Sequence, residues 1–134
     1  MKRIAGVAVM AALMSVSLVA TATAHNVTYN SKVTMHVNTN GSEDDFIEGG
    51  VRSDSDRCLD RAVSVFRVVE AGDDELYFGT FTDDNGFYGA FTDDTPAGTY
   101  YASIGRLVLR KNSKHKHLCK AATSPERVVT APAP

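Results

Sequence analysis

The sequence predicts an all-β fold, an antiparallel β-sandwich of seven or eight strands closed by one disulfide bond. Three observations lead to this prediction. Beyond the first 24 residues, apolar and polar residues alternate with a period of two, which is the period of a half-buried strand. The apolar positions favour β-branched and aromatic side chains, as strands do. Clusters of Gly, Asp, Asn and Pro, which are typical of turns, separate the segments.

The first 24 residues are excluded from this fold, because they have the pattern of a secretory signal peptide. Lys2 and Arg3 precede an apolar run over residues 4–20, and small residues follow at Ala22 and Ala24. We expect cleavage after Ala24, with cleavage after Ala22 as the alternative. The run is too short to span a membrane. The mature chain is therefore expected to be secreted, either extracellular or periplasmic if the host has an outer membrane, where disulfides persist.

The mature chain would have 110 residues (134 minus 24), which is enough for one domain with a modest core. Without Lys2 and Arg3 it has 12 basic against 16 acidic residues, a net charge of about −4, which argues against general nucleic-acid binding. We expect a monomer without a membrane span. The predicted organisation is a signal peptide over 1–24, an N-terminal strand and linker over 25–45, the β-sandwich core domain over 46–130 and a flexible tail over 131–134.

Eight segments are predicted to be strands. In chain order they cover residues 33–37, 46–53, 62–69, 75–82, 87–91, 99–109, 117–121 and 127–130. Their inward-facing positions predict a core that includes Val51, Val63, Val65, Phe78, Tyr88, Tyr100, Ala102 and Ile104. In the longest segment the apolar residues move from even-numbered to odd-numbered positions around Gly105. We therefore expect a β-bulge at Gly105 that returns the apolar side chains to the inward face. Residues 111–116 would then form a polar hairpin loop that returns to Cys119.

Cys58 and Cys119 are the two cysteines of the chain. In an oxidising compartment two cysteines are what one bridge needs, and these two are too far apart in sequence for a zinc motif. Nothing around either residue indicates a nucleophile. We therefore expect a structural disulfide that closes a loop of about 60 residues, which the chain-entropy model values at roughly 4 kcal/mol.

The order of several landmarks along the chain is also informative. They are Gly50-Val51-Arg52-Ser53, Cys58-Leu59, Arg61 to Phe66, Gly79 to Tyr88, Ala97 to Ala102 and Cys119 to Ser124. This order resembles the prealbumin-like (transthyretin-like, carboxypeptidase-regulatory-like) β-sandwiches, whose architecture is immunoglobulin-like, such as the B-type repeats of collagen adhesins. More narrowly, it resembles small secreted bacterial proteins of that type with one Cys pair. The similarity covers roughly residues 46–130 and implies an architecture, not an activity.

Four histidines are candidate metal ligands. Cleavage after Ala24 would expose His25 as the first residue, whose α-amine and imidazole together can chelate copper. His36, or the pair His115 and His117, could supply a further ligand. Imidazole and amine nitrogens suit Cu(II). The alternative interpretation is that His115 and His117 belong to a solvated, Lys-rich loop.

Charge is distributed unevenly along the chain. Residues 70–94 contain eight acids and no base, whereas residues 106–120 contain six bases and no acid. The basic stretch could bind an anionic polymer or an acidic macromolecule. Its candidate binding residues are Arg110, Lys111, Lys114 and Lys116. The alternative is that these cations keep an exposed hairpin soluble and unpaired at its edge.

The sequence carries no recognisable catalytic motif, since it lacks G-x-S-x-G, H-E-x-x-H and a glycine-rich phosphate loop. Asp83, Asp84 and Asn85 could offer oxygens to calcium, but these residue types before a glycine are typical of turns. We expect a secreted, non-enzymatic β-sandwich without a cofactor, which serves as a binding or structural module for an unknown macromolecular partner or anionic polymer. The alternative is a periplasmic or extracellular copper-binding protein that uses His25.

Overall fold

The computed structural model describes residues 24–39, 45–112 and 114–131. The predicted signal peptide up to residue 23 and the last three residues of the predicted tail lie outside this range. The described residues form eleven strands: β1 His25–Tyr29, β2 Ser31–Asn38, β3 Asp45–Ser53, β4 Ala62–Arg67, β5 Glu75–Phe81, β6 Phe87–Thr92, β7 Gly98–Ile104, β8 Leu107–Lys111, β9 His115–Cys119, β10 Ala122–Thr123 and β11 Arg127–Val129. One 3-10 turn, η1, covers Asp56–Cys58. In this part of the chain no helix is long and apolar enough to cross a membrane.

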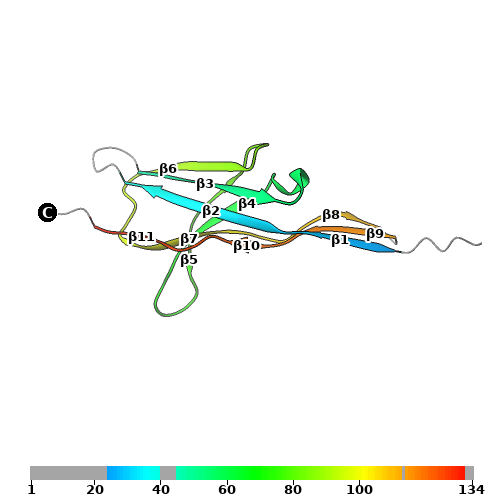
Figure 1. Cartoon of the computed structure of the whole chain (residues 1–134). Helices are drawn as coiled ribbons and strands as arrows, with labels where there is room; N and C mark the ends of the chain where they lie inside the picture. Colours follow the sequence, from blue (N-terminus) through cyan, green and yellow to red (C-terminus); the bar gives the residue numbers. More distant parts are fainter. Residues whose placement is uncertain (1–23, 40–44, 113, 132–134) are drawn as a thin grey trace, which may run out of the picture.

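Two antiparallel sheets pack face to face, which confirms the predicted all-β sandwich (Figure 1). One sheet has the strand order β2-β3-β6, and the other has the order β10-β7-β4-β5, with β11 also paired to β7. The core between them is formed by Val33, Met35, Ile47, Val51, Val63, Val65, Tyr88, Tyr100, Ala102, Ile104 and Val129. Burying these side chains provides the main favourable contribution to folding.

The predicted core residues are buried with one exception, because Phe78 is only partly buried against the cluster. The core also includes residues that the sequence assigned to an N-terminal strand and linker. Val33 and Met35 on β2 are both 1% exposed. The sandwich core therefore extends N-terminally beyond residue 46, to the whole of β2.

A third sheet, β1-β9-β8, extends beyond the sandwich as an arm at the end opposite the described C-terminus (Figure 1). The predicted bulge at Gly105 is wrong, because the chain leaves one sheet there and enters another. β7 ends at Ile104, and β8 begins at Leu107 in the arm. The polar hairpin is also shorter than predicted, since β9 already begins at His115. In contrast to the antiparallel pairs of the sandwich, β1 runs parallel to β9.

The predicted disulfide is present at the root of the arm. Cys58 in η1 is bonded to Cys119 at the end of β9, and both are fully buried. Cys119 lies opposite Tyr29 of β1 and opposite Leu107 of β8. The bridge therefore ties the sandwich to the central strand of the arm.

A buried arginine lies at the same root. Arg61 is 4% exposed, and its guanidinium donates hydrogen bonds to the backbone carbonyls of Gly105, Lys120 and Cys58. A further bond goes to the hydroxyl of Ser31, at 3.3 Å. Burial lowers the pKa of Arg61, because the charged form loses its hydration. Arg61 thus connects β2 and η1 with the two points at the root where the chain enters β8 and leaves β9.

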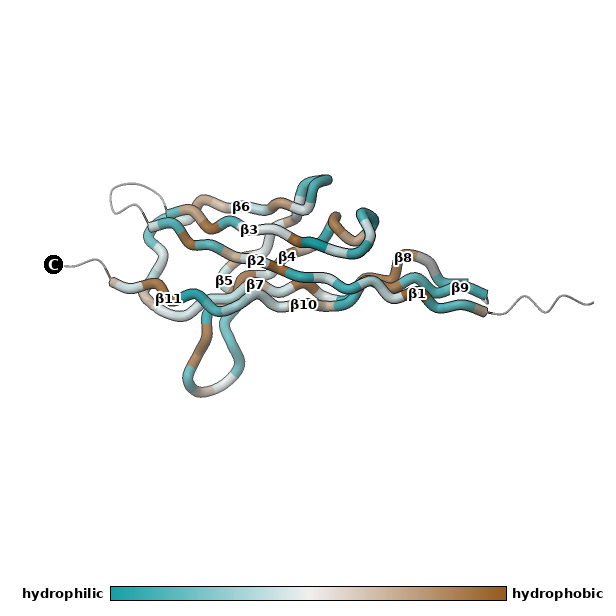
Figure 2. The backbone as a smooth tube through the Cα atoms, viewed as in Figure 1, coloured by the Kyte–Doolittle hydropathy of each residue, from teal (hydrophilic) through white to brown (hydrophobic). Residues whose placement is uncertain are grey.

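The turn between β5 and β6 contains Asp83, one of the residues that could offer oxygens to calcium. One carboxylate oxygen of Asp83 accepts hydrogen bonds from the backbone N–H groups of Asn85 and Phe87, each at 2.9 Å. Gly86 has φ +83°, and a Cβ atom there would lie 2.5 Å from the carbonyl oxygen of Val51. Asp83 therefore serves to form the turn, which Figure 2 shows as a hydrophilic segment.

The buried tyrosines predict how stability changes at alkaline pH. Burial raises the pKa of Tyr88 well above its ordinary value of 10.0, and it also raises the pKa of Tyr100. Unfolded tyrosines ionise near pH 10, whereas these two hold their protons to a higher pH in the fold. Their contribution to stability is therefore complete below about pH 10 and is lost as the pH rises further. Urea unfolding between about pH 9 and pH 11 should show this fall. In Tyr88→Phe the free energy of unfolding should fall less steeply with pH. A slope equal to that of the wild type would contradict the raised pKa of Tyr88.

Candidate metal centre

The pairing of β1 with β9 brings together three histidines that lie far apart in sequence. In the parallel register His25 lies opposite His115, and Val27 lies opposite His117. Successive side chains in a strand point to opposite faces, so His115 and His117 share one face of β9. His25 occupies the same face on the neighbouring strand.

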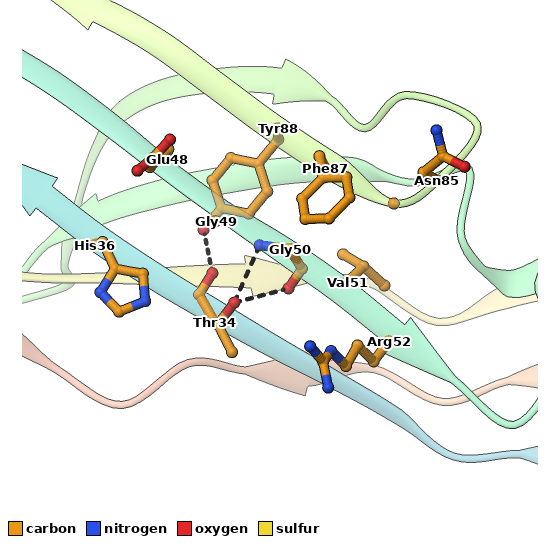
Figure 3. A pocket seen from close by; sticks show the side chains of 11 residues that line it. Thr34, His36, Glu48, Gly49, Gly50, Val51, Arg52, Asn85, Phe87 and Tyr88 are labelled. Carbon is orange, nitrogen blue, oxygen red and sulfur yellow. Dashed lines mark hydrogen bonds between the residues drawn. The ribbon is translucent and has the colours of Figure 1, made fainter.

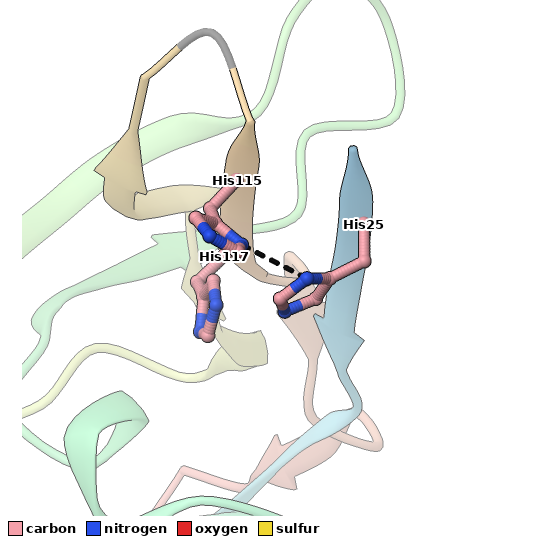
Figure 4. Close-up of side chains that lie close together, drawn as sticks. All are labelled: His25, His115 and His117. Atoms are coloured by element: carbon pink, nitrogen blue, oxygen red, sulfur yellow. Dashed lines mark hydrogen bonds between the residues drawn. The ribbon is translucent and has the colours of Figure 1, made fainter. Parts of the chain in front are cut away.

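The three imidazoles converge near the tip of the arm (Figure 4). The Nδ1 atoms of His25 and His115 are 2.9 Å apart, which is a hydrogen-bond distance. One potential ligand nitrogen from each of the three rings lies within 4.8 Å of the other two. His25 is exposed, whereas His115 and His117 are half-buried. The hydrogen bond requires that one of the two Nδ1 atoms carries a proton and that the other presents a lone pair.

His117 also has an unsatisfied nitrogen. Its Nδ1 atom is buried and has no hydrogen-bond partner among the described residues. The ring lies beside the ring of His25, at a centroid distance of 5.8 Å, and beside that of Tyr29, at 6.2 Å. A buried polar atom without a partner costs about 1–3 kcal/mol, and such atoms are rare in native proteins. This atom is therefore evidence for a partner from outside the chain.

The backbone nitrogen of His25 lies against the turn between β8 and β9. It donates a hydrogen bond of 3.0 Å to the carbonyl oxygen of Lys114. The side-chain oxygen of Asn112 accepts bonds from the N–H groups of Lys114 and His115, which fixes this turn. In a chain that starts at His25, the same nitrogen would be the free α-amine. The α-amine and Nδ1 of one histidine can close a six-membered chelate ring on a metal ion.

The fourth histidine is not part of the cluster. His36 lies on β2, in the sheet β2-β3-β6, where it is exposed and lines a groove with Glu48 and Phe87. The sequence offered His36 and the pair on β9 as equal alternatives to partner His25. The structure brings only His115 and His117 to it.

The predicted basic residues lie on the same hairpin as the cluster. Lys111 and Lys114 are exposed, and Lys116 is half-buried. Lys116 alternates with His115 and His117 along β9, so it belongs to the opposite face of the arm. Arg110 lies on β8 opposite His117, and its side chain lies outside the described part. The four cations thus share one end of the molecule.

Comparison of this chain with protein-family models, with curated proteins and with solved structures finds no match. The resemblance to prealbumin-like β-sandwiches therefore stays a prediction from the sequence. Any functional proposal has to rest on the chemistry of the described side chains.

Proposed function

We propose that this protein is a secreted, non-enzymatic module that binds one Cu(II) ion through His25, His115 and His117. The single observation that carries the proposal is the convergence of three imidazoles, one of which has a buried nitrogen without a partner. The arm β1-β9-β8, which extends beyond the sandwich, carries the site.

The spacing of the nitrogens supports a shared metal ion. Metal–imidazole bonds are about 2.0–2.1 Å long, so two nitrogens bound side by side to one ion lie roughly 3 Å apart. The Nδ1 atoms of His25 and His115 are already 2.9 Å apart. A metal ion would replace the proton that these atoms share. Small rotations about the side-chain torsions of His117 would suffice to add its nitrogen, because all three ligand atoms lie within 4.8 Å.

The ligand types favour copper among the divalent first-row metals. Affinity in nitrogen sites generally rises along the series to a maximum at Cu(II) and falls again at Zn(II). The α-amine of a chain that starts at His25 would add a fourth nitrogen, since it lies next to Nδ1 of the same residue. Four nitrogens around one ion match the tetragonal geometry that Cu(II) prefers.

The proposal is binding rather than catalysis, because the sequence carries no recognisable catalytic motif. Secretion agrees with the buried disulfide between Cys58 and Cys119, since disulfides persist in oxidising compartments. The cations on the same hairpin would weaken the attraction of a positive ion at low salt, an effect that salt screens. The affinity must therefore come from coordinate bonds rather than from surface charge.

The test is a competition titration of Cu(II) against a chelator, with a chain that begins at His25. His117→Phe keeps an aromatic ring but removes the nitrogen, and we expect it to weaken binding at least roughly 100-fold, the upper end of what loss of a supporting partner costs. His36→Phe is the matched control and should leave the affinity unchanged. Equal affinities for His117→Phe and the wild type would overturn the proposed site.

A second variant examines the α-amine. One alanine placed before His25 converts the amine into an amide, which removes a ligand while all three imidazoles remain. We expect this extension to weaken Cu(II) binding at least about tenfold, or 1.4 kcal/mol. Undiminished binding would show that the site consists of the imidazoles alone.

A further inference from the structure

The outer face of the sheet β2-β3-β6 carries a groove that has no connection with the metal centre. It has a volume of about 530 Å³, within the range of small-molecule sites. Figure 3 shows the groove, with Phe87 and Thr34 beside its middle, His36 and Glu48 toward one end, and Arg52 and Asn85 toward the other. No side chain covers its middle, because Gly50 occupies the outward-facing position of β3 there.

Gly49 permits a close approach of Tyr88 and of the Thr34 carbonyl group to β3. Tyr88 passes its ring across Gly49, and its hydroxyl donates a 2.7 Å hydrogen bond to the carbonyl oxygen of Thr34. A Cβ atom on Gly49 would collide with that carbonyl oxygen and with the tyrosine hydroxyl. The N–H group of Gly50 bonds to the side-chain hydroxyl of Thr34 at 3.1 Å. Side chains thus take part in the hydrogen bonding between the two strands at this point.

Gly50 keeps the floor of the groove open. A Cβ atom on Gly50 would have no neighbour closer than 3.7 Å, to Phe87 and to the hydroxyl of Thr34. The protein therefore has room for a side chain there and does not use it. A glycine inside a strand often marks a place where a ligand or another backbone approaches closely.

The walls of the groove combine one flat apolar surface with exposed polar side chains that have no hydrogen bond within the described residues. The ring of Phe87 is 65% exposed, although it is a large apolar side chain. His36, Glu48 and Arg52 are exposed as well, and within the described residues none of their side chains forms a hydrogen bond to the protein. Glu48 offers acceptors, Arg52 offers donors, and the amide of Asn85 offers both. Glu48 and Arg52 carry opposite charges at the two ends of the groove (Figure 3), so a ligand with charges of one sign along its length would meet a like charge at one end.

We infer that this groove binds a neutral oligosaccharide. A pyranose ring has a flat C–H face that can pack on Phe87, and hydroxyl groups around its rim that both donate and accept hydrogen bonds. Glu48 and Arg52 lie four residues apart on β3, about 13 Å along the strand, so hydroxyls of different sugar units would pair with the two side chains. The length of the groove, from His36 at one end to Asn85 at the other, suits two or three sugar units. A secreted protein would meet such chains on cell surfaces.

The experiment is an NMR titration of the isotope-labelled protein with four trisaccharides: chitotriose, cellotriose, maltotriose and mannotriose. We expect at least one to cause saturable shifts of the Gly50 and Phe87 amide signals, with Kd of about 1 mM or lower. Gly50→Val places a side chain in the groove, where its Cβ atom has no neighbour closer than 3.7 Å, and should weaken binding at least about tenfold. The matched control is Gly79→Val, on the outer face of β5, where a Cβ atom also has room; it should bind as the wild type does.

Three results would overturn the inference. They are the absence of saturable shifts at Gly50 and Phe87 with all four sugars, equal binding by Gly50→Val and the wild type, and shifts of these signals caused by trialanine but by none of the sugars. The last result would assign the groove to peptides. A Phe87→Ala variant provides a check that does not alter the backbone, and it should also lose the sugar-dependent shifts.

Discussion

A double variant with Cys58→Ala and Cys119→Ala is expected to unfold with a free energy about 4 kcal/mol below that of the oxidised protein. The bond closes a loop with a sequence separation of 61 residues, so its loss returns a large amount of conformational freedom to the unfolded chain. Domains of this kind are typically stable by about 5–15 kcal/mol in total. The loss therefore removes a large fraction of the stability.

The consequence should be greatest in the arm. Cys119 lies at the base of β9, between Tyr29 of β1 and Leu107 of β8. Urea unfolding measures the total loss, and hydrogen exchange should show that amides of β1, β8 and β9 lose protection before those of β4 and β7. Reduced wild-type protein is the control and should match the double variant. A loss below about 1 kcal/mol would contradict the role assigned to the bridge.

Replacing Arg61 by methionine is expected to destabilise the protein by about 3 kcal/mol, although the apolar stem is retained. The carbonyl groups of Gly105, Lys120 and Cys58 accept hydrogen bonds from this guanidinium. Without it all three carbonyl groups would lose a charged hydrogen-bond donor, and the cost should be largest at Cys58, which is buried.

Urea unfolding of Arg61→Met beside the exposed control Arg57→Met measures this contribution. Arg57 lies in η1 and is exposed, so its replacement should change the stability by less than about 0.5 kcal/mol. Replacing a buried charge by an apolar side chain is neutral or stabilising in some proteins. If Arg61→Met is as stable as the wild type, the hydrogen bonds at the root of the arm do not determine its stability.

The sandwich could be predicted because its strands bury one face. Alternation with a period of two identified the inward positions, and Val63, Val65 and Tyr100 are buried as predicted. The break at Gly105 was not predictable in the same way. Near Gly105 the apolar residues move from even-numbered to odd-numbered positions. A bulge within one strand and a chain that crosses to another sheet both produce this pattern, so the sequence does not distinguish them.

The candidate site could be predicted only in part. The sequence identifies His25, His115 and His117 as nitrogen donors, but 90 residues separate His25 from His115. Their proximity depends on a parallel register between β1 and β9 that leaves no local pattern in the sequence. The sequence alone does not separate His36 from the other candidates. It is excluded by its position on β2, in the sheet β2-β3-β6 and not in the arm. The groove depends on how Tyr88 crosses Gly49, a tertiary contact that alternation does not reveal.

The most direct measurement of the central proposal is an electron paramagnetic resonance spectrum of a chain that begins at His25, with one equivalent of Cu(II). We expect a single axial Cu(II) signal with hyperfine splitting from several nitrogens. The signal should reach its maximum at one ion per chain and change in His117→Phe but not in His36→Phe. A spectrum of hydrated Cu(II), or a nitrogen-split signal that His117→Phe leaves unaltered, would contradict a copper site built from His25, His115 and His117.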